Sequence, residues 1–248
     1  MSKIKLFCIP YAGGGAAIYK KWEQSLLPDI ELVAVELAGR GRRSNEQLYK
    51  DVPAAVEDVY NCILPSIMDG KPYAIFGHSM GAMLTFQVAH KIAKTGYPKP
   101  AHLFFGGRGA PHVVSEREKM YHEMLDEEFK EEVLNLGGTP QEFFDYPELV
   151  DYMMPILKND FKISETAPLM NQTDKLKIPF TVFIGKEEED QISPEAATGW
   201  YKHTTKKCAV HFMNGGHFFI NDEYKKMIAT MRSELVKVSE KYKVSRLI

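Results

Sequence analysis

Short apolar runs that alternate with longer amphipathic segments constrain most strongly what this chain can fold into. Runs rich in Ile, Val and Phe occupy residues 4–10, 30–37, 73–79, 102–107, 178–185 and 208–213. Segments with the apolar spacing of helices separate most of them. Nearly continuous apolar strands that take turns with helices are typical of a parallel sheet covered on both faces. The sequence therefore predicts an α/β protein with a mostly parallel, doubly wound sheet.

The alternation stops after about residue 110 and resumes near residue 178, and the stretch between is charged and helical throughout. We interpret it as a helical lid inserted at about 112–172 into a single domain that spans residues 1–248. Apolar residues recur there at spacings of three and four: Met120, Met124, Leu125, Phe129, Val133 and Leu134. Such a stripe fits packing of the insertion and fits a surface that faces substrate, and both interpretations stay open.

Composition excludes several classes of function. With 31 Lys and Arg against 33 Asp and Glu, the formal charge of −2 provides no broad cationic field for nucleic acid or anionic lipid. The start of the chain lacks the features of a signal peptide, and no apolar run reaches the length of a membrane span, so we expect a cytoplasmic protein. Three distant cysteines form neither a disulfide framework nor a zinc-ligand pattern. We expect no metal and no cofactor.

The pentapeptide Gly77 to Gly81, GHSMG, ends the third apolar run and directly precedes a helical pattern. A nucleophile elbow needs a strand that ends, a tight turn and a helix that begins at once, because this geometry holds the serine hydroxyl above the sheet. Gly77 and Gly81 lack the β-carbons that would collide on either side of Ser79. The helix that follows aims backbone N–H groups and its positive dipole end at the same place. The pattern predicts Ser79 as a nucleophile.

A serine nucleophile requires a base within hydrogen-bond reach. Seven of the eight histidines lie in the elbow, the insertion or predicted helices and strands, whereas His217 lies in a glycine-rich loop after the last strand. This position, last in chain order, is where a fold with such an elbow places its base. The third member should be a carboxylate in the loop GKEEEDQIS. We predict Asp190, the only aspartate there, with Glu188 and Glu189 open as alternatives.

Attack on a carbonyl group also requires donors for the developing oxyanion. We predict the backbone N–H of Met80, directly after the nucleophile, and that of Ala12 in the loop after the first strand. Three consecutive glycines follow Ala12 and allow a close approach of the backbone. As a nucleotide-binding loop, AGGG has neither of the glycine spacings that bind phosphate, which argues against nucleotide binding.

Taken together, these motifs resemble those of the type II thioesterases that accompany nonribosomal peptide and polyketide synthases, which are α/β-hydrolases, and of their relative in medium-chain fatty acid synthesis. The resemblance covers nearly the whole chain. The segments that carry it are FCIPYAGGGA, ELAGRGRR, FGHSMGAM, LGGTP, MPILKNDF and NGGHFFI. Two positions depart from the family pattern. Ala38 replaces a proline, and Glu188 holds the position at which relatives carry an aspartate, so alignment favours Glu188 where residue type favours Asp190.

The resemblance implies hydrolysis of acyl or aminoacyl thioesters on the phosphopantetheine arm of an acyl or peptidyl carrier protein. We also expect the enzyme to act as a monomer. It also implies that the insertion covers the acyl group. We hypothesise that Arg40, Arg42, Arg43 and Arg108 meet the acidic carrier, or else form ordinary loop charges and internal ion pairs. The alternatives are a general carboxylesterase or lipase, a medium-chain acyl thioesterase, and a hydrolase fold kept as a binding module.

Overall fold

The computed structural model describes residues 3–114, 120–138, 141–188 and 192–245. Within these residues one six-stranded sheet runs in the order β2-β1-β3-β4-β5-β6, and every neighbouring pair is parallel. Its strands are β1 (Ile4–Ile9), β2 (Ile30–Ala34), β3 (Tyr73–His78), β4 (His102–Gly106), β5 (Phe180–Gly185) and β6 (Cys208–Met213). Each of the six apolar runs thus contains a strand, which confirms the predicted parallel sheet.

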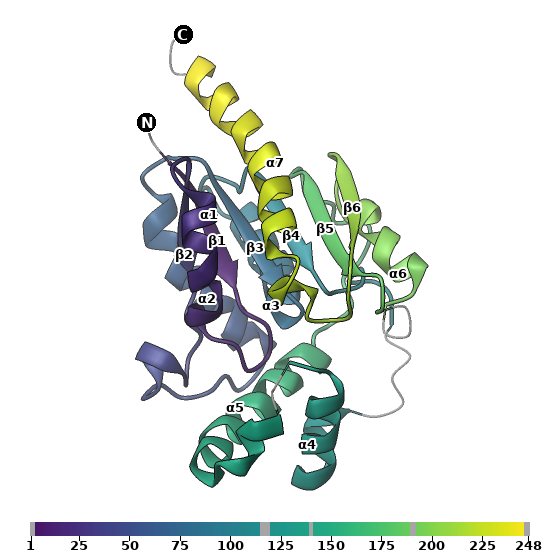
Figure 1. Ribbon diagram of the computed structural model, residues 1–248. Coiled ribbons are helices and arrows are strands. Elements are labelled where there is room, and N and C mark those ends of the chain that lie inside the picture. Colours follow the sequence, from purple (N-terminus) through teal and green to yellow (C-terminus); the bar gives the residue numbers. More distant parts are fainter. Residues whose placement is uncertain (1–2, 115–119, 139–140, 189–191, 246–248) are drawn as a thin grey trace.

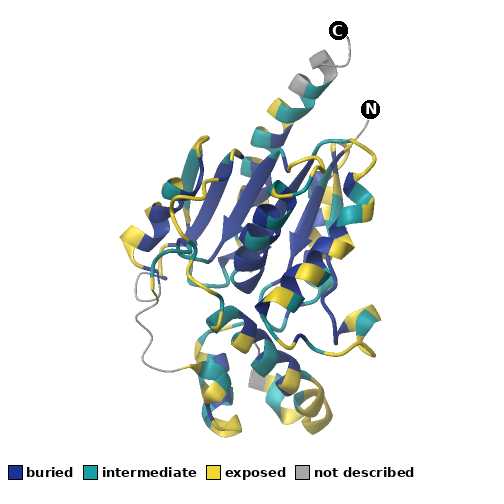
Figure 2. Cartoon of the chain, turned by 180° about the vertical axis from the view of Figure 1, so that it is seen from behind, coloured by how far each residue is buried: buried dark blue, intermediate teal, exposed yellow. Residues whose placement is uncertain are grey.

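Helices cover both faces of the sheet, as Figures 1 and 2 show from opposite sides. One face carries α1 (Glu23–Leu26) and α7 (Tyr224–Ser245), and the other carries α2 (Val52–Ile67), α3 (Met80–Ala93) and α6 (Pro194–Thr198). Short 3₁₀ turns complete the connections: η1 (Ala16–Trp22), η2 (Gly41–Arg43), η3 (Tyr121–Glu123), η4 (Gln141–Asp145), η5 (Gly199–His203) and η6 (Phe219–Asn221). The doubly wound arrangement is therefore as predicted.

The two apolar layers follow from the alternation of side chains along each strand. In β3, Phe76 packs in the cluster that contains Trp22 and Met231, whereas its neighbour Ile75 packs in the cluster that contains Leu84. All six residues of β3 are buried. Because neighbouring side chains of a strand point to opposite faces, a central strand between two helical layers has to be apolar throughout. This buried strand ends at His78, directly before Ser79 and the start of α3.

The insertion between β4 and β5 contains α4 (Asp126–Asn135) and α5 (Pro147–Glu165), which lie beyond the carboxyl ends of the strands (Figure 1). Phe129 and Val133 of α4 pack with Met154 and Leu157 of α5 in a small core of their own. The apolar stripe thus serves the packing of the insertion on itself.

Two residues of that stripe do not pack as expected. Leu125 is 79% exposed and Met120 is 45% exposed. Both precede Asp126, the first residue of α4, and Leu125 has extended backbone angles, so helical spacing does not apply to them.

In the described residues no helix is long and apolar enough to cross a membrane.

Candidate active site

Ser79 lies in the turn between β3 and α3 with φ of 53° and ψ of −114°. Residues other than glycine rarely adopt this backbone conformation. A β-carbon on Gly77 would lie 2.0 Å from the carbonyl oxygen of Gly81. One on Gly81 would lie 2.2 Å from the carbonyl oxygen of Ile9 in β1. The strand end and the helix start are therefore too close for any side chain at either position, as an elbow requires.

A chain of two hydrogen bonds starts at the Ser79 hydroxyl. Its Oγ lies 3.0 Å from Nε2 of His217, and Nδ1 of His217 lies 2.6 Å from Oε1 of Glu188. Because an ionised carboxylate only accepts, Nδ1 carries the proton and Nε2 is free to accept the proton of the hydroxyl. The arrangement can deprotonate Ser79 and stabilise the imidazolium that results. The structure thus brings together Ser79 and His217, which lie 138 residues apart.

Glu188 holds the place that we predicted for Asp190. Its side chain is fully buried, and Oε2 accepts a hydrogen bond of 2.6 Å from the backbone N–H of Gly185. Asp190 and Glu189 lie outside the described residues. His217 Nδ1 has one proton to donate, and Glu188 accepts it, so we propose Glu188, one of the two alternatives to Asp190, as the acid of the site.

The predicted oxyanion loop forms a tight turn in which the N–H of Gly14 donates to the carbonyl oxygen of Tyr11 at 2.9 Å. Gly13, at the third position of this turn, has φ of +76°. Neither Ala12 N–H nor Met80 N–H donates to a residue that the structure describes. Met80 is the first residue of α3, where backbone N–H groups have no partner within the helix. The assignment of these two groups as oxyanion donors stays a prediction.

His78, which the sequence reasoning set aside, borders the site. Its ring is fully buried, and Nε2 lies 2.8 Å from the backbone carbonyl oxygen of His217. Because a carbonyl oxygen only accepts, Nε2 carries the proton of a neutral ring. Burial, and then the proximity of His217, hold the pKa of His78 well below its ordinary value of 6.5. His78 therefore holds the backbone of the loop that carries the base.

Three of the four arginines considered for contact with a carrier protein follow the other alternative, internal ion pairs and hydrogen bonds. Arg40 is 4% exposed, and both of its Nη atoms donate to Asp160 of α5, at 2.5 and 2.7 Å. Arg43 is paired with two carboxylates of neighbouring segments. Arg108 donates to a side chain and a carbonyl group of α5. These three guanidinium groups are engaged within the protein, and Arg42 is the exposed member of the set.

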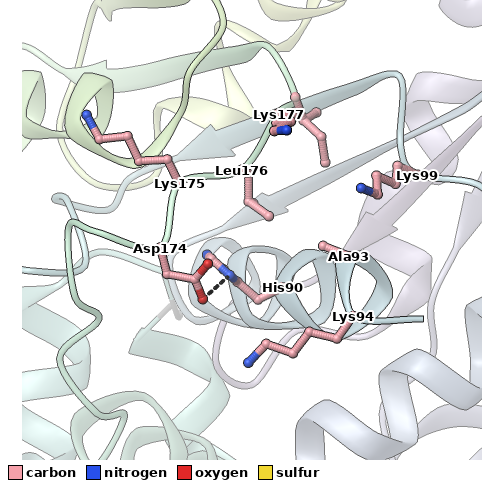
Figure 3. A pocket seen from close by; sticks show the side chains of 9 residues that line it. His90, Ala93, Lys94, Lys99, Asp174, Lys175, Leu176 and Lys177 are labelled. Carbon is pink, nitrogen blue, oxygen red and sulfur yellow. Dashed lines mark ion pairs between the residues drawn. The ribbon is translucent and has the colours of Figure 1, made fainter. Parts of the chain in front are cut away.

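A cavity of about 210 Å³ lies at the other end of α3 (Figure 3). It is lined by His90, Ala93, Lys94, Lys99, Asp174, Lys175, Leu176, Lys177 and Ile178. His90 contacts Asp174 there, with Nδ1 and Oδ2 3.5 Å apart. Helix α3 has 14 residues, so a rise of about 1.5 Å per residue separates this cavity from Ser79 by roughly 20 Å. The cavity is therefore distinct from the site around Ser79.

A parallel α/β sheet with a serine in the turn after a central strand, followed along the chain by an acid and a histidine, defines an α/β-hydrolase. The chain belongs to the thioesterase domain family, whose sequence model matches residues 4–235. That match spans nearly the whole of the structure described above and confirms the resemblance found in the sequence.

Individual relatives agree with this assignment. The gramicidin S biosynthesis protein GrsT of Aneurinibacillus migulanus is 33% identical over 94% of this chain and 90% of its own. The medium-chain S-acyl fatty acid synthase thioesterase of Rattus norvegicus is 31% identical over 87% of this chain and 81% of its own. The crystal structure of ClbQ, from the colibactin NRPS/PKS pathway, matches with a TM-score of 0.89 and 33% identity over 96% of this chain and 99% of ClbQ.

Proposed function

We propose that this thioesterase hydrolyses acyl or aminoacyl thioesters on the phosphopantetheine arm of a carrier protein, and so clears misprimed or stalled groups from a peptide or polyketide synthase. The observation that carries the proposal is the hydrogen-bonded series Ser79, His217 and Glu188 at the carboxyl end of the sheet, with α4 and α5 beyond it. Similarity to GrsT and ClbQ, whose names refer to peptide and mixed peptide–polyketide pathways, supports the choice of substrate.

Acylation begins when the Ser79 hydroxyl oxygen attacks the thioester carbon and its proton passes to Nε2 of His217. Glu188 stabilises the imidazolium through Nδ1–H. The tetrahedral intermediate carries its negative charge on the former carbonyl oxygen, where the N–H groups of Ala12 and Met80 would donate to it. When the intermediate collapses, the carbon–sulfur bond breaks and the imidazolium protonates the departing thiolate, which leaves as the carrier thiol.

Deacylation repeats these proton transfers with water as the nucleophile. His217 takes a proton from a water molecule as the water oxygen attacks the ester carbon of the acyl-enzyme. Collapse of the second intermediate breaks the bond to Ser79 Oγ, which regains its proton from the imidazolium. The products are the free acid and the regenerated hydroxyl.

The proposal is tested with carrier proteins loaded with acetyl, longer acyl and aminoacyl groups. We expect the wild-type chain to release them and Ser79→Ala to lose nearly all of that activity. Labelling of Ser79 by a fluorophosphonate provides an independent readout of its reactivity. Release by Ser79→Ala at the wild-type rate would refute the mechanism, whereas a wild-type chain that is labelled but inactive on every loaded carrier would refute the substrate class.

A second candidate function is hydrolysis of medium-chain acyl thioesters, which the similarity to the Rattus norvegicus enzyme favours. Turnover of acyl carriers, acyl-CoA of increasing chain length and simple esters, measured side by side, separates it from carrier editing and from a general carboxylesterase.

That the enzyme acts as a monomer in the cytoplasm stays a prediction. Light scattering in solution tests whether it is a monomer.

A further inference from the structure

Asp160 is a fully buried carboxylate on the lid helix α5, outside the series that contains Ser79. Its Oδ1 accepts from Arg40, and its Oδ2 accepts both from Arg40 and from the backbone N–H of Gly13, the latter at 2.8 Å. Arg40 also donates to the carbonyl oxygen of Gly14 at 3.1 Å. The buried ion pair therefore holds two successive residues of the loop that follows β1.

A second contact joins the same helix to the same loop. Leu157, one turn before Asp160 on α5, fills the space beside Gly13, where a β-carbon would lie 2.4 Å from its Cδ2. Gly13 occupies the third position of the turn from Tyr11 to Gly14, and its φ of +76° is typical of a type II turn. This turn type differs from type I by a flip of the peptide that joins the two central residues, Ala12 and Gly13.

We infer that Asp160 and Arg40 are positioning residues, which set the conformation of the oxyanion loop from the lid. This inference rests on the proposed function, since it gives the loop around Ala12 the role of binding the oxyanion. The carboxylate accepts the N–H of the Ala12–Gly13 peptide. A flip of that peptide would turn its carbonyl oxygen toward the carboxylate, where two acceptors repel each other. The ion pair thus favours one of the two conformations of the Ala12–Gly13 peptide. The predicted donor, Ala12 N–H, lies in the neighbouring Tyr11–Ala12 peptide of the same turn, whose carbonyl oxygen accepts from Gly14 N–H.

The consequence concerns the transition state more than the bound substrate. Donors preorganised for an oxyanion act on a charge that the ground-state thioester does not carry. If Asp160 fixes the loop, its loss lowers kcat and the affinity for tetrahedral adducts and leaves binding of the uncleaved acyl chain unchanged. General damage to the lid would instead weaken all of these together.

The main variant is the double substitution Arg40→Met with Asp160→Leu. It removes both charges at once, because a single substitution would leave an unpaired charge in the interior, whereas apolar replacement of a buried pair is often tolerated. We expect kcat for thioester release to fall about 100-fold while KM stays within about threefold. A boronic acid that forms a tetrahedral adduct on Ser79 should lose affinity by a similar factor. An amide analogue of the substrate, with NH in place of sulfur, should bind as it does to the wild type.

Lys158→Met is the matched control. Lys158 lies on the same helix and pairs with Asp126 and the carbonyl oxygen of Met124 within the insertion, away from the loop after β1. Like the double variant, Lys158→Met deletes one ion pair of α5. We expect kcat and the affinities for the boronic acid and the amide analogue to stay at wild-type values. Should the double variant not fold, Asp160→Asn keeps the size of the side chain but sets an amide NH2 against Arg40 or the Gly13 N–H, and it should lower kcat and boronic acid affinity about tenfold.

A folded double variant, or a folded Asp160→Asn, with wild-type kcat and wild-type boronic acid affinity would overturn the inference. Equal loss of boronic acid and amide analogue affinity would overturn it as well, since the ion pair would then support the lid in general. Failure of the proposed function looks different, because in that case the wild-type chain itself releases no thioester product.

Discussion

Both carboxylate oxygens of Glu188 accept hydrogen bonds, and these two bonds fix the side chain beside His217. Oε1 accepts from His217 and Oε2 accepts from the backbone of Gly185, in a position closed to solvent. A carboxylate fixed in this way keeps the imidazole in the tautomer whose Nε2 can accept the Ser79 proton. The geometry thus supports our proposal of Glu188 among the acids of the run KEEED.

Exchange of a carboxylate for an amide tests this assignment. We expect Glu188→Gln to lower kcat/KM for a loaded carrier by about a thousandfold or more, because an amide can donate to Nδ1 and stabilise the wrong tautomer. Asp190→Asn makes the same chemical change two residues away and should leave kcat/KM within about twofold of the wild type. The reverse ranking of the two variants would return the role to Asp190.

The sequence predicted Ser79 and His217 because each has a local pattern, a glycine-flanked turn or a glycine-rich loop at the required place in the chain. It placed the acid within a run of four consecutive acids, where residue type favoured Asp190 and alignment favoured Glu188, and no local pattern separates the two. Arg40 and Asp160 were missed as a pair because 120 residues separate them. One signal was present, as Asp160 falls on the face of α5 that otherwise buries Ile156 and Ile163.

At the scale of elements, the turn from β3 to α3 depends on backbone atoms that nearly touch. The first turn of α3 passes so close to the end of β1 that Gly81 faces the carbonyl oxygens of Ile9 and Pro10. Backbone atoms at the centre of a sheet cannot retreat as a flexible side chain can. The elbow is therefore a property of three elements together, although its sequence pattern is local.

Gly81→Ala should destabilise the protein even though alanine is the better helix former. Its β-carbon would lie 2.2 Å from the carbonyl oxygen of Ile9, and we expect a loss of about 3 kcal/mol in the free energy of unfolding. Gly96→Ala is the control, since no atom lies within 4 Å of its β-carbon, and it should change stability by less than about 0.5 kcal/mol. Urea unfolding measures both, and equal stabilities would contradict the argument.

For the molecule as a whole, the order of apolar runs and the gap between the fourth and the fifth were sufficient to predict the sheet and the insertion. A parallel strand that is buried on both faces consists of nearly continuous apolar residues, and this run is visible in the sequence alone. The packing position of the insertion could not be predicted in the same way. Its contacts with the loop after β1 join residues more than 140 positions apart in the sequence. Periodicity indicates that a helix has a buried face but does not identify what that face meets.

Stability should fall as the pH is lowered through the range in which free histidine takes up a proton. His102, at the start of β4, donates or accepts a hydrogen bond with Thr181 at 2.9 Å, and burial lowers its pKa to about 4. Between pH 6.5 and 4 the unfolded chain therefore binds a proton that the folded chain does not, so acidification favours unfolding. At pH 5 this histidine alone costs about 2 kcal/mol.

Urea unfolding at pH 7.5 and pH 5 measures that cost. His102→Gln keeps a side chain that can hydrogen-bond to Thr181 but cannot titrate in this range. We expect the variant to lose about 2 kcal/mol less than the wild type between the two pH values. The other histidines are present in both chains and cancel in the comparison. An identical pH dependence would show that His102 takes up its proton equally well in the folded state.

The contacts of α5 with the loop after β1 also bear on how such enzymes can diverge or be rebuilt. A lid that only covered the acyl group could be exchanged for another as an independent module, with a change in the chain lengths accepted. Here α5 of the insertion supplies Leu157 and Asp160 to the loop after β1. If the insertion of this chain were replaced by one that lacks an acid equivalent to Asp160, the buried Arg40 would lose its ion-pair partner. Arg40 and the insertion therefore have to be inherited or grafted together.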